Sequence, residues 1–395
     1  MTAGTSMASA FAVLHEPHDF VLVAVSYPHR WRTGSEYVRS RVAAYAAAGL
    51  RGVVVDYSPL NVAEPYVSND DSSTVVVIRP PDLPAALDAI AASGSPVLAH
   101  SPTPAALHEL HTRFAHGGLA VWFHGYEVRD YRRLQCNTTT EQLFAIRHIR
   151  DAQNRDRFRA AAPVFNEPAV TKVFVSETQR RYSEFDVGVE ARNVQIIPNH
   201  IDTDTYRARQ RQPVESRKIL LLRGFAQRNY ANDVALRALE ICSRRDGFSV
   251  LEITVRGYGQ HFRREVAGVR RFDNVTVEEG FSSPAQMAAL HDAHGIYLCP
   301  TRYDTQGVML GEAMSSGMAT ITNPVAAIPD FTDDTCSLLP RGNDPWAFAD
   351  ALWYLVQHPD VMPKLSSNAA ARVSRQCGWD ATIRKEIELI RRLTS

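Results

Sequence analysis

The sequence predicts an α/β protein built from two Rossmann-like domains in tandem, each with a parallel sheet. Short apolar runs rich in Val, Leu and Ile alternate with segments of helical spacing, which is the pattern of parallel strands buried on both faces. The alternation breaks at a polar segment, Arg207–Arg217, and then begins again. With 395 residues and 45% apolar content, the chain is long enough for two substantial cores.

The first half is predicted to alternate strands and helices from Phe20 onward. Its first helix is typical, because Val38, Val42 and Tyr45 share one side and Gly49 ends it. The predicted strands are Phe20–Ser26, Val53–Tyr57, Val75–Ile78, Val97–His100, Leu119–Phe123, Lys172–Ser176 and Val194–Ile197. The predicted helices are Tyr37–Ala48, Leu83–Ala92 and Pro104–Phe114, with a further helix between the last two strands.

The second half repeats the pattern. Its best-marked helix is Asp344–Gln357, because Asn343 or Asp344 can cap it and Pro345 suits its first turn. The predicted strands are Lys218–Leu222, Leu251–Val255, Val275–Glu278, Gly295–Pro300 and Ala319–Thr322. The other predicted helices are Asn232–Arg244 and Val308–Ser316, the latter ended by Gly317.

The domain boundary is predicted near Pro213, inside the polar segment. This gives a first domain of residues 1–213 and a second of residues 214–377. In two such domains, the carboxyl ends of both sets of strands would face a common cleft, where a ligand is expected.

Composition excludes several classes of protein. Lys plus Arg and Asp plus Glu are equal at 43, so no global charge favours nucleic acid or an anionic membrane. The five cysteines are scattered and form no CxxC pair, which favours reduced thiols over a disulfide framework or a zinc site. No signal peptide or membrane-spanning stretch is visible, so a cytoplasmic location is expected.

The most informative stretch is Cys299–Asp330, where a buried strand turns into a short helix near Gly307. Glu312 lies in that helix among apolar residues. A lone carboxylate there is costly unless it is paired, and a ligand rich in hydroxyls would pair with it. The helix N-terminus offers free backbone N–H groups and positive dipole, which suit a phosphate. One element can therefore hold phosphate at its tip and hydroxyls along its side.

This stretch resembles the motif of the retaining family-four glycosyltransferases of the GT-B fold. The family pattern is a proline, an acidic residue, a glycine-containing turn and a second acidic residue, here Pro300, Asp304, Gly307 and Glu312. The resemblance implies that Glu312 binds the donor ribose hydroxyls, that Asp304 contacts the transferred sugar, and that amides around 306–308 (Gln306, Gly307, Val308) bind the diphosphate. The first acid is Asp where the family usually has Glu, and Thr305-Gln306 replaces a Gly-aromatic pair. This form is similar to a subgroup of bacterial surface-polysaccharide transferases.

Other positions match the same family in the same order along the chain. Arg223 and Arg228 resemble the basic pair that neutralises the donor diphosphate, a role that suits bidentate arginine contacts. The remaining matches are Gly257 and Gly259 of the GxG loop, His124 of the HG motif facing the sugar, Gly34 in the first strand-to-helix loop, and Trp379 in the C-terminal region. The resemblance implies that residues 378–395 cross back onto the first domain.

Each of these positions also has an ordinary structural interpretation. Gly257-Tyr258-Gly259 alone fits a turn, and His124 fits a buried core histidine. Asp304 and Glu312 fit a helix cap and a surface residue, while the two arginines fit solvated side chains. The apolar flanks of Glu312 and the position of Arg223 after a strand favour the functional interpretation.

Three further patterns favour structure over function. His108 and His111 lack metalloprotease spacing and are predicted to lie on a surface helix. The sequon at Asn137 is a chance match if the protein is cytoplasmic. Arg129–Arg159 carries eight arginines against four acids, which fits a solvated helical face or contact with an anionic acceptor or lipid surface.

The predicted function is transfer of a sugar, with retention, from a nucleotide-diphosphate sugar to a saccharide or lipid-linked saccharide. No cofactor and no metal are expected, although Asp202-Thr203-Asp204 spells the DxD motif of metal-dependent transferases. The enzyme is expected in the cytoplasm, with possible peripheral contact on the inner face of the membrane, and no nucleic acid is expected as partner. Two alternatives stay open: a nucleotide-sugar epimerase, and a non-catalytic GT-B module in a polysaccharide complex.

Overall fold

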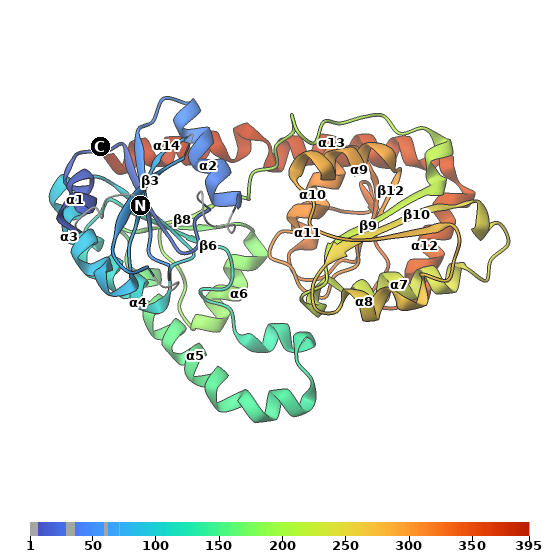
Figure 1. Cartoon of the computed structure of the whole chain (residues 1–395), viewed down its shortest axis with the longest axis horizontal. Coiled ribbons are helices and arrows are strands. Elements are labelled where there is room, and N and C mark those ends of the chain that lie inside the picture. Colours follow the sequence, from blue (N-terminus) through green and yellow to red (C-terminus); the bar gives the residue numbers. More distant parts are fainter. Residues whose placement is uncertain (1–6, 29–35, 59–61, 71, 395) are drawn as a thin grey trace. The chain divides into compact units, whose positions relative to one another are not determined.

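The computed structural model describes residues 7–28, 36–58, 62–70 and 72–394, which form two compact units. Unit 1 comprises Met1–Tyr131, Ile146–His200 and Asp380–Ser395, and unit 2 comprises Arg132–Ala145 and Ile201–Trp379. Each unit is a sheet with helices on both faces, as the sequence predicts (Figure 1).

Unit 1 is built on an eight-stranded sheet in the order β3-β4-β2-β1-β5-β6-β7-β8. All neighbouring strands are parallel except β3 and β4. The strands are β1 Phe20–Ala24, β2 Gly52–Asp56, β3 Tyr66–Asn69, β4 Thr74–Val77, β5 Val97–His100, β6 Leu119–Phe123, β7 Thr171–Phe174 and β8 Val194–Ile196. The helices of this part of the chain are α1 Met7–Ala12, α2 Glu36–Ala47, α3 Leu83–Ser93, α4 Pro104–Phe114, α5 Thr140–Asn166, α6 Glu177–Val187 and α14 Ile383–Thr394.

The two faces of the unit 1 sheet are covered by different helices. Apolar residues of α2 and α14 pack with one face, and those of α3, α4 and the end of α5 pack with the other. The strands are apolar throughout, as β1 shows with five buried residues, because both of their faces are covered. Gly49, at φ +85°, follows α2 and accommodates the left-handed conformation that ends it.

Unit 2 is built on a six-stranded, wholly parallel sheet in the order β11-β10-β9-β12-β13-β14. The strands are β9 Lys218–Gly224, β10 Glu252–Tyr258, β11 Val275–Glu279, β12 Ile296–Leu298, β13 Ala319–Ile321 and β14 Ser337–Leu338. The helices are α7 Asn232–Cys242, α8 Phe262–Glu265, α9 Pro284–Ala293, α10 Val308–Ser315, α11 Ile328–Phe331, α12 Pro345–Gln357 and α13 Met362–Cys377.

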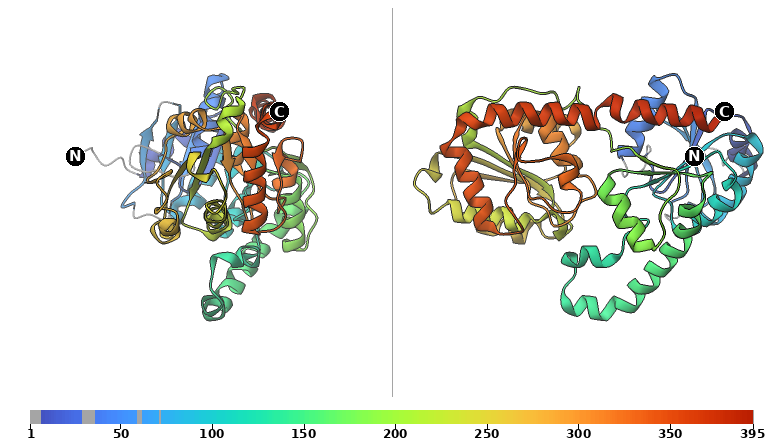
Figure 2. Two further views of the ribbon diagram at one scale, coloured as in Figure 1. Left: turned by 90° about the vertical axis from the view of Figure 1, so that its right-hand side faces the viewer. Right: turned by 180° about the vertical axis from the view of Figure 1, so that it is seen from behind.

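Helices α7 and α12 pack on one face of the unit 2 sheet, and α10 and α13 on the other. The predicted cap of α12 is confirmed, because the Asp344 carboxylate accepts the Trp346 N–H at 3.0 Å and Pro345 occupies the first turn. Figure 2 shows the last two helices in red, with α13 along unit 2 and α14 along unit 1. The structure thus groups Asp380–Ser395 with unit 1, close to the expected return of residues 378–395.

The division between the units falls after His200, thirteen residues before the expected boundary at Pro213. Residues 201–212 pack against unit 2, although their composition is that of a linker. The Ile201 N–H donates to the Cys377 carbonyl at 2.9 Å. Arg211 is fully buried and donates to the carbonyl oxygens of Ser316 at 2.7 Å and His294 at 2.9 Å. A buried arginine satisfied by backbone carbonyls cannot be distinguished from a solvated one by composition.

Candidate functional site

Glu312 lies on α10 with its carboxyl group in apolar surroundings. Burial raises the pKa of Glu312 to about 8, and an interaction with the Tyr206 hydroxyl opposes that shift. The Tyr206 hydroxyl is itself buried, and no described residue offers it a hydrogen bond of ordinary geometry. The same burial and the nearby Glu312 raise the pKa of Tyr206. The ligand-free protein therefore holds a carboxyl group and a hydroxyl group that are poorly satisfied by each other.

Arg223 is a buried cation at the end of β9, with 4% of its side chain exposed. Its nearest carboxylate is that of Asp304, with 4.0 Å between Nη2 and Oδ2, and its Nε has no hydrogen-bond partner. The guanidinium lies over the Tyr230 ring, 4.6 Å from the ring centroid. A buried guanidinium this loosely paired leaves room for an anionic ligand to complete its contacts.

Arg228 begins a short helical turn, Arg228–Tyr230, in the loop between β9 and α7. Its guanidinium forms no hydrogen bond or ion pair with any described residue. The backbone of the turn is instead well held, because Arg302 donates to the Arg228 carbonyl at 2.7 Å and also forms an ion pair with Asp233. The backbone of the turn is therefore fixed while the Arg228 guanidinium stays unpaired among the described residues, and Tyr230 of the same turn lies against Arg223.

The N-terminus of α10 lies beside the same residues. Gly307 is the N-cap residue of α10, with φ +80°, and it has no side chain that could accept a hydrogen bond from the first-turn amides. The amides from Val308 onward can therefore bind a ligand or water. The Gln306 amide donates to the Asp304 carboxylate at 3.3 Å, and the Gln306 side chain is buried toward the Cys377 sulfur. The Gln306 side chain thus supports the turn, and the amides that follow Gly307 have no side-chain cap.

Gly257 and Gly259 shape the strand end that carries Arg223. A Cβ at Gly257 would lie 2.1 Å from the Arg223 carbonyl oxygen, and one at Gly259, where φ is +136°, would lie 2.4 Å from the Ala226 nitrogen. Both clashes are with backbone atoms, which can move only at a high cost in free energy. The glycines let β10 approach the segment after β9, so the structure gives them a role in positioning that segment.

Two exposed aromatic side chains at this edge are absent from the sequence prediction. Tyr258 is the last residue of β10 and Phe281 follows β11; they are 50% and 69% exposed and pack edge to face with ring centroids 5.7 Å apart. Carboxyl ends of adjacent parallel strands share one edge of a sheet, so the pair lies at the same edge as Arg223. Exposure cannot be read from one sequence, and only their position at the carboxyl ends of two strands could have singled them out.

In unit 1 the structure pairs His124, which follows β6, with His100 at the end of β5. Their ring nitrogens, Nε2 of His124 and Nδ1 of His100, lie 3.1 Å apart, and His100 also stacks on Trp122. Burial and the charge of Arg41 lower the pKa of His124 to about 3, and burial lowers that of His100. Both imidazoles are therefore neutral. Sequence analysis missed His100, whose only signal is its place at a strand end.

A buried polar network is connected to the His100–His124 pair through Asn199. Arg41 on α2 donates to Asn199 at 2.9 Å and forms an ion pair with Glu386 of α14 at 3.0 Å, and Tyr45 donates to the same carboxylate. Asn199 in turn interacts with His124. Gly34, the remaining predicted site residue of this domain, lies outside the described residues.

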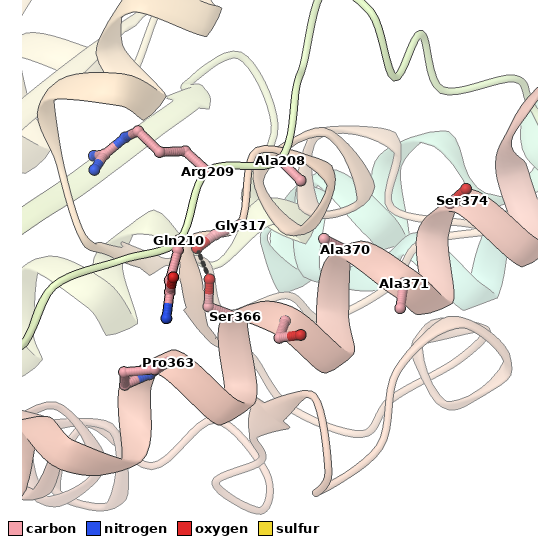
Figure 3. A pocket seen from close by; sticks show the side chains of 10 residues that line it. Ala208, Arg209, Gln210, Gly317, Pro363, Ser366, Ala370, Ala371 and Ser374 are labelled. Atoms are coloured by element: carbon pink, nitrogen blue, oxygen red, sulfur yellow. Dashed lines mark hydrogen bonds between the residues drawn. The ribbon is translucent and has the colours of Figure 1, made fainter.

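A cavity of about 550 Å³ in unit 2 lacks the buried acidic, basic and histidine side chains described above (Figure 3). One wall is a face of α13 made of small residues, and the only charged side chain that lines it, Arg209, is paired with Glu215. The lining residues are Ala208, Arg209, Gln210, Gly317, Pro363, Ser366, Ser367, Ala370, Ala371 and Ser374. Such a cavity offers no group that would recognise a charged ligand.

Metal and membrane features were sought in the part of the chain that the structure describes. Within it, no group of three or more His, Cys, Asp or Glu side chains is arranged to hold a metal ion. His108 is exposed on α4 as expected, but His111 is only partly exposed, and its Nε2 atom is buried without a hydrogen-bond partner among the described residues. No helix of the described ranges combines the length and the apolar character needed to cross a bilayer.

Comparison with known proteins identifies the fold. Residues 216–358 match the family described as glycosyl transferases group 1. The chain is similar to sucrose-phosphate synthase from Thermosynechococcus elongatus, with 18% identity, a TM-score of 0.69, and 95% of this chain and 99% of that chain covered. It is also similar to WaaG, a glycosyltransferase involved in lipopolysaccharide biosynthesis, with 15% identity, a TM-score of 0.67 and coverage of 94% and 99%.

A third similar structure is that of Anabaena HepE in complex with UDP, with 12% identity, a TM-score of 0.65, and coverage of 94% and 100%. The search of curated proteins gave no match. At identities this low the structural likenesses establish the fold alone, and the family match covers only residues 216–358. The chain therefore has the GT-B fold, and its residues 216–358 match the family of glycosyl transferases group 1.

Proposed function

We propose that this protein transfers a sugar, with retention, from a nucleotide-diphosphate sugar to a saccharide or lipid-linked saccharide. The observation that carries the donor assignment is the buried, loosely paired Arg223 beside the unpaired Arg228 and the uncapped N-terminus of α10. Two cations and a set of oriented amides match a diphosphate. Glu312 would then accept hydrogen bonds from the ribose, and the exposed Tyr258 and Phe281 offer aromatic surface for the base.

The proposed reaction follows from these charges. The bond between the anomeric carbon and the diphosphate breaks, the electron pair leaves with the diphosphate, and the two arginines stabilise that charge. The acceptor oxygen bonds to the same carbon and loses its proton to the departing phosphate. For His124 of unit 1 we keep the role that the family resemblance implies, and its neutral imidazole would not oppose a positive charge that develops on the sugar.

The proposal extends to the biological setting. WaaG is named for lipopolysaccharide biosynthesis, and the sequence resembles a surface-polysaccharide subgroup, so we assign the acceptor to that class. All five cysteines are free, which favours the cytoplasm. Exposed Phe144 and Ile149 lie among the arginines of α5, which supports peripheral contact with an anionic membrane face.

The donor assignment is tested by thermal unfolding with a panel of nucleoside diphosphates and nucleotide sugars, since a ligand of the native state raises the melting temperature. A nucleotide sugar that stabilises the protein is then incubated with and without saccharide acceptors. An epimerase would convert the donor alone, and a non-catalytic module would bind without turnover. Absence of any stabilising nucleotide would contradict the proposal.

Replacing Arg228 by Ala is expected to weaken use of the donor about 10- to 100-fold, from loss of about 1.5–3 kcal/mol in charge-assisted hydrogen bonds. The loss should be larger for the nucleoside diphosphate than for the nucleoside, measured as dissociation constants by calorimetry. Equal losses for the two ligands would show that Arg228 does not contact the diphosphate.

Activity is expected to persist in excess EDTA, because fixed charges already offset the diphosphate. The competing interpretation rests on Asp202-Thr203-Asp204. In the structure the Asp202 carboxylate accepts the amides of Asp204 at 3.0 Å and Thr205 at 3.1 Å and the Thr205 hydroxyl at 2.6 Å, so it closes a local turn. Activity lost in EDTA, restored by manganese, and missing from an Asp202→Ala/Asp204→Ala variant would establish a metal requirement instead.

A further inference from the structure

Residues 132–145, here called the excursion, leave unit 1 and return to it, yet they pack as part of unit 2. The chain on either side, up to Tyr131 and from Ile146, belongs to unit 1. The excursion contains all but the first residue of a short helical segment, Tyr131–Asn137, and the first turns of α5. We propose that Asn137 of the excursion is a positioning residue for the donor site, acting through the turn that carries Arg228.

The contact between Asn137 and this turn is specific. The side-chain oxygen of Asn137 accepts two consecutive backbone amides, that of Arg228 at 2.7 Å and that of Asn229 at 2.9 Å. These are first-turn donors that lack partners within their own helix, and Gln227, the residue before the turn, supplies no side-chain cap. Asn137 therefore caps the Arg228 turn from a position 91 residues earlier in the chain.

The other polar contacts of the turn come from unit 2 itself. Arg302 and Thr301 bind the Arg228 and Asn229 carbonyl oxygens, at 2.7 Å and 2.9 Å. These contacts hold the carbonyl side of the turn, and Asn137 holds the amide side. Without Asn137 the first two amides would donate to water instead, and the backbone of Arg228 would gain conformational freedom. A guanidinium on a freer backbone loses more entropy when it binds a phosphate.

The chemistry of the side chain fits this role. A carboxamide oxygen accepts both amides without adding charge, whereas a carboxylate at the same place would attract Arg228 and repel a diphosphate. The assignment also gives the Asn of the Asn137-Thr138-Thr139 sequon an internal use for its side chain. It rests on the proposed function, because it needs Arg228 to meet the donor diphosphate.

The structural part is tested without a ligand. Hydrogen–deuterium exchange of the Asn137→Ala variant should be faster than wild type in peptides that cover Arg228 and Asn229. The matched control is Gln135→Ala, an exposed neighbour whose side chain forms no hydrogen bond with the described residues. Unchanged exchange in Asn137→Ala would overturn the capping role.

The functional part is tested by calorimetry with UDP, ADP and GDP and the matching nucleosides. For the diphosphate that binds the wild type most tightly, Asn137→Ala should lose about 3- to 10-fold in affinity, with less than about 2-fold lost for the nucleoside. Asn137→Asp should keep the two amides protected from exchange and yet lose more affinity for the diphosphate than Asn137→Ala. If Asn137 were a purely structural cap, Asn137→Asp would instead lose less affinity than Asn137→Ala.

A double-mutant cycle decides whether the effect passes through Arg228. In an Arg228→Ala background, Asn137→Ala should cost no further affinity, because there is no guanidinium left to position. Additive losses would overturn the inference while leaving the proposed function intact. A wild-type protein that binds none of the three diphosphates would contradict the proposed function, and this role of Asn137 with it, whatever the exchange result.

Discussion

A Glu312→Gln variant is expected to lose nearly all transfer activity and, at the same time, to unfold at a higher temperature than the wild type. The carboxyl group lies in apolar surroundings that raise its pKa to about 8, and the Tyr206 hydroxyl only partly offsets this. The amide is of equal size and carries no charge, so it avoids the cost of ionising a half-buried group in apolar surroundings. It also cannot accept hydrogen bonds from two ribose hydroxyls as a carboxylate does, so donor binding suffers.

The gain in stability has a defined pH dependence. Below about pH 4.5 the carboxyl group is protonated in both the folded and the unfolded chain and contributes no difference. Between about pH 4.5 and 8 the unfolded chain releases the proton while the folded chain retains it, so the wild type loses stability as the pH rises. The advantage of the Gln variant should therefore be small at pH 5 and reach about 2–4 kcal/mol at pH 8.

The measurement is the melting temperature of both proteins at the two pH values, without ligand and with the nucleoside diphosphate that stabilises the wild type. Glu388→Gln, at an exposed position on α14, is the matched control and should shift neither quantity. A folded Glu312→Gln protein with wild-type turnover and donor affinity would rule out the ribose assignment. A melting temperature unchanged at pH 8 would show that the group is not held in its acid form.

The fold could be predicted because most of its strands are visible in the sequence. Strands such as β1 and β6 are buried along their whole length, so their sequences are unbroken apolar runs that leave little choice of structure. Helix ends followed from local chemistry, as at Gly49 and the Asp344 cap. The prediction of two parallel sheets with helices between the strands is confirmed by the structure and by the solved structures of the same fold.

What the sequence did not reveal has identifiable causes. Strand β3 is a short edge strand whose four residues alternate between half-buried and exposed, so it lacks an apolar run. Helix α5 is largely polar around its circumference and contains Pro163, which argues against a continuous helix of 27 residues. The grouping of residues 132–145 with unit 2 includes a contact between Asn137 and Arg228, and no local pattern encodes such a distant contact.

The candidate site, too, could be predicted only in part from the sequence. The acidic and basic positions followed from the family motif, and the structure brings Arg223, Asp304 and the Arg228 turn together at one sheet edge. The function of the glycines in Gly257-Tyr258-Gly259 needed the backbone positions, because it lies in what a Cβ would strike. His100 escaped notice because a buried histidine becomes informative only when its neighbour is known.

Removal of the Glu386 carboxylate is expected to destabilise unit 1 by about 3–5 kcal/mol, because it would leave Arg41 as a buried, unpaired cation. Both side chains are almost completely buried, and the ion pair joins the C-terminal helix α14 to α2 at 3.0 Å. Tyr45 loses its acceptor in the same change. The test is chemical denaturation of Glu386→Ala, with Glu388→Ala, on the exposed side of α14, as control.

The physical reason predicts how the loss can be recovered. If the damage is the unpaired charge, then replacing both partners, as in Arg41→Met/Glu386→Leu, should regain most of the stability lost by Glu386→Ala, since an apolar pair of similar volume needs no counter-ion. Recovery should be incomplete, because Asn199 and Tyr45 keep polar groups that the pair now satisfies. If the double variant were as unstable as Glu386→Ala, packing of α14 and not charge would account for the loss. A single Glu386→Ala change with wild-type stability would show that α14 is held by its apolar face alone.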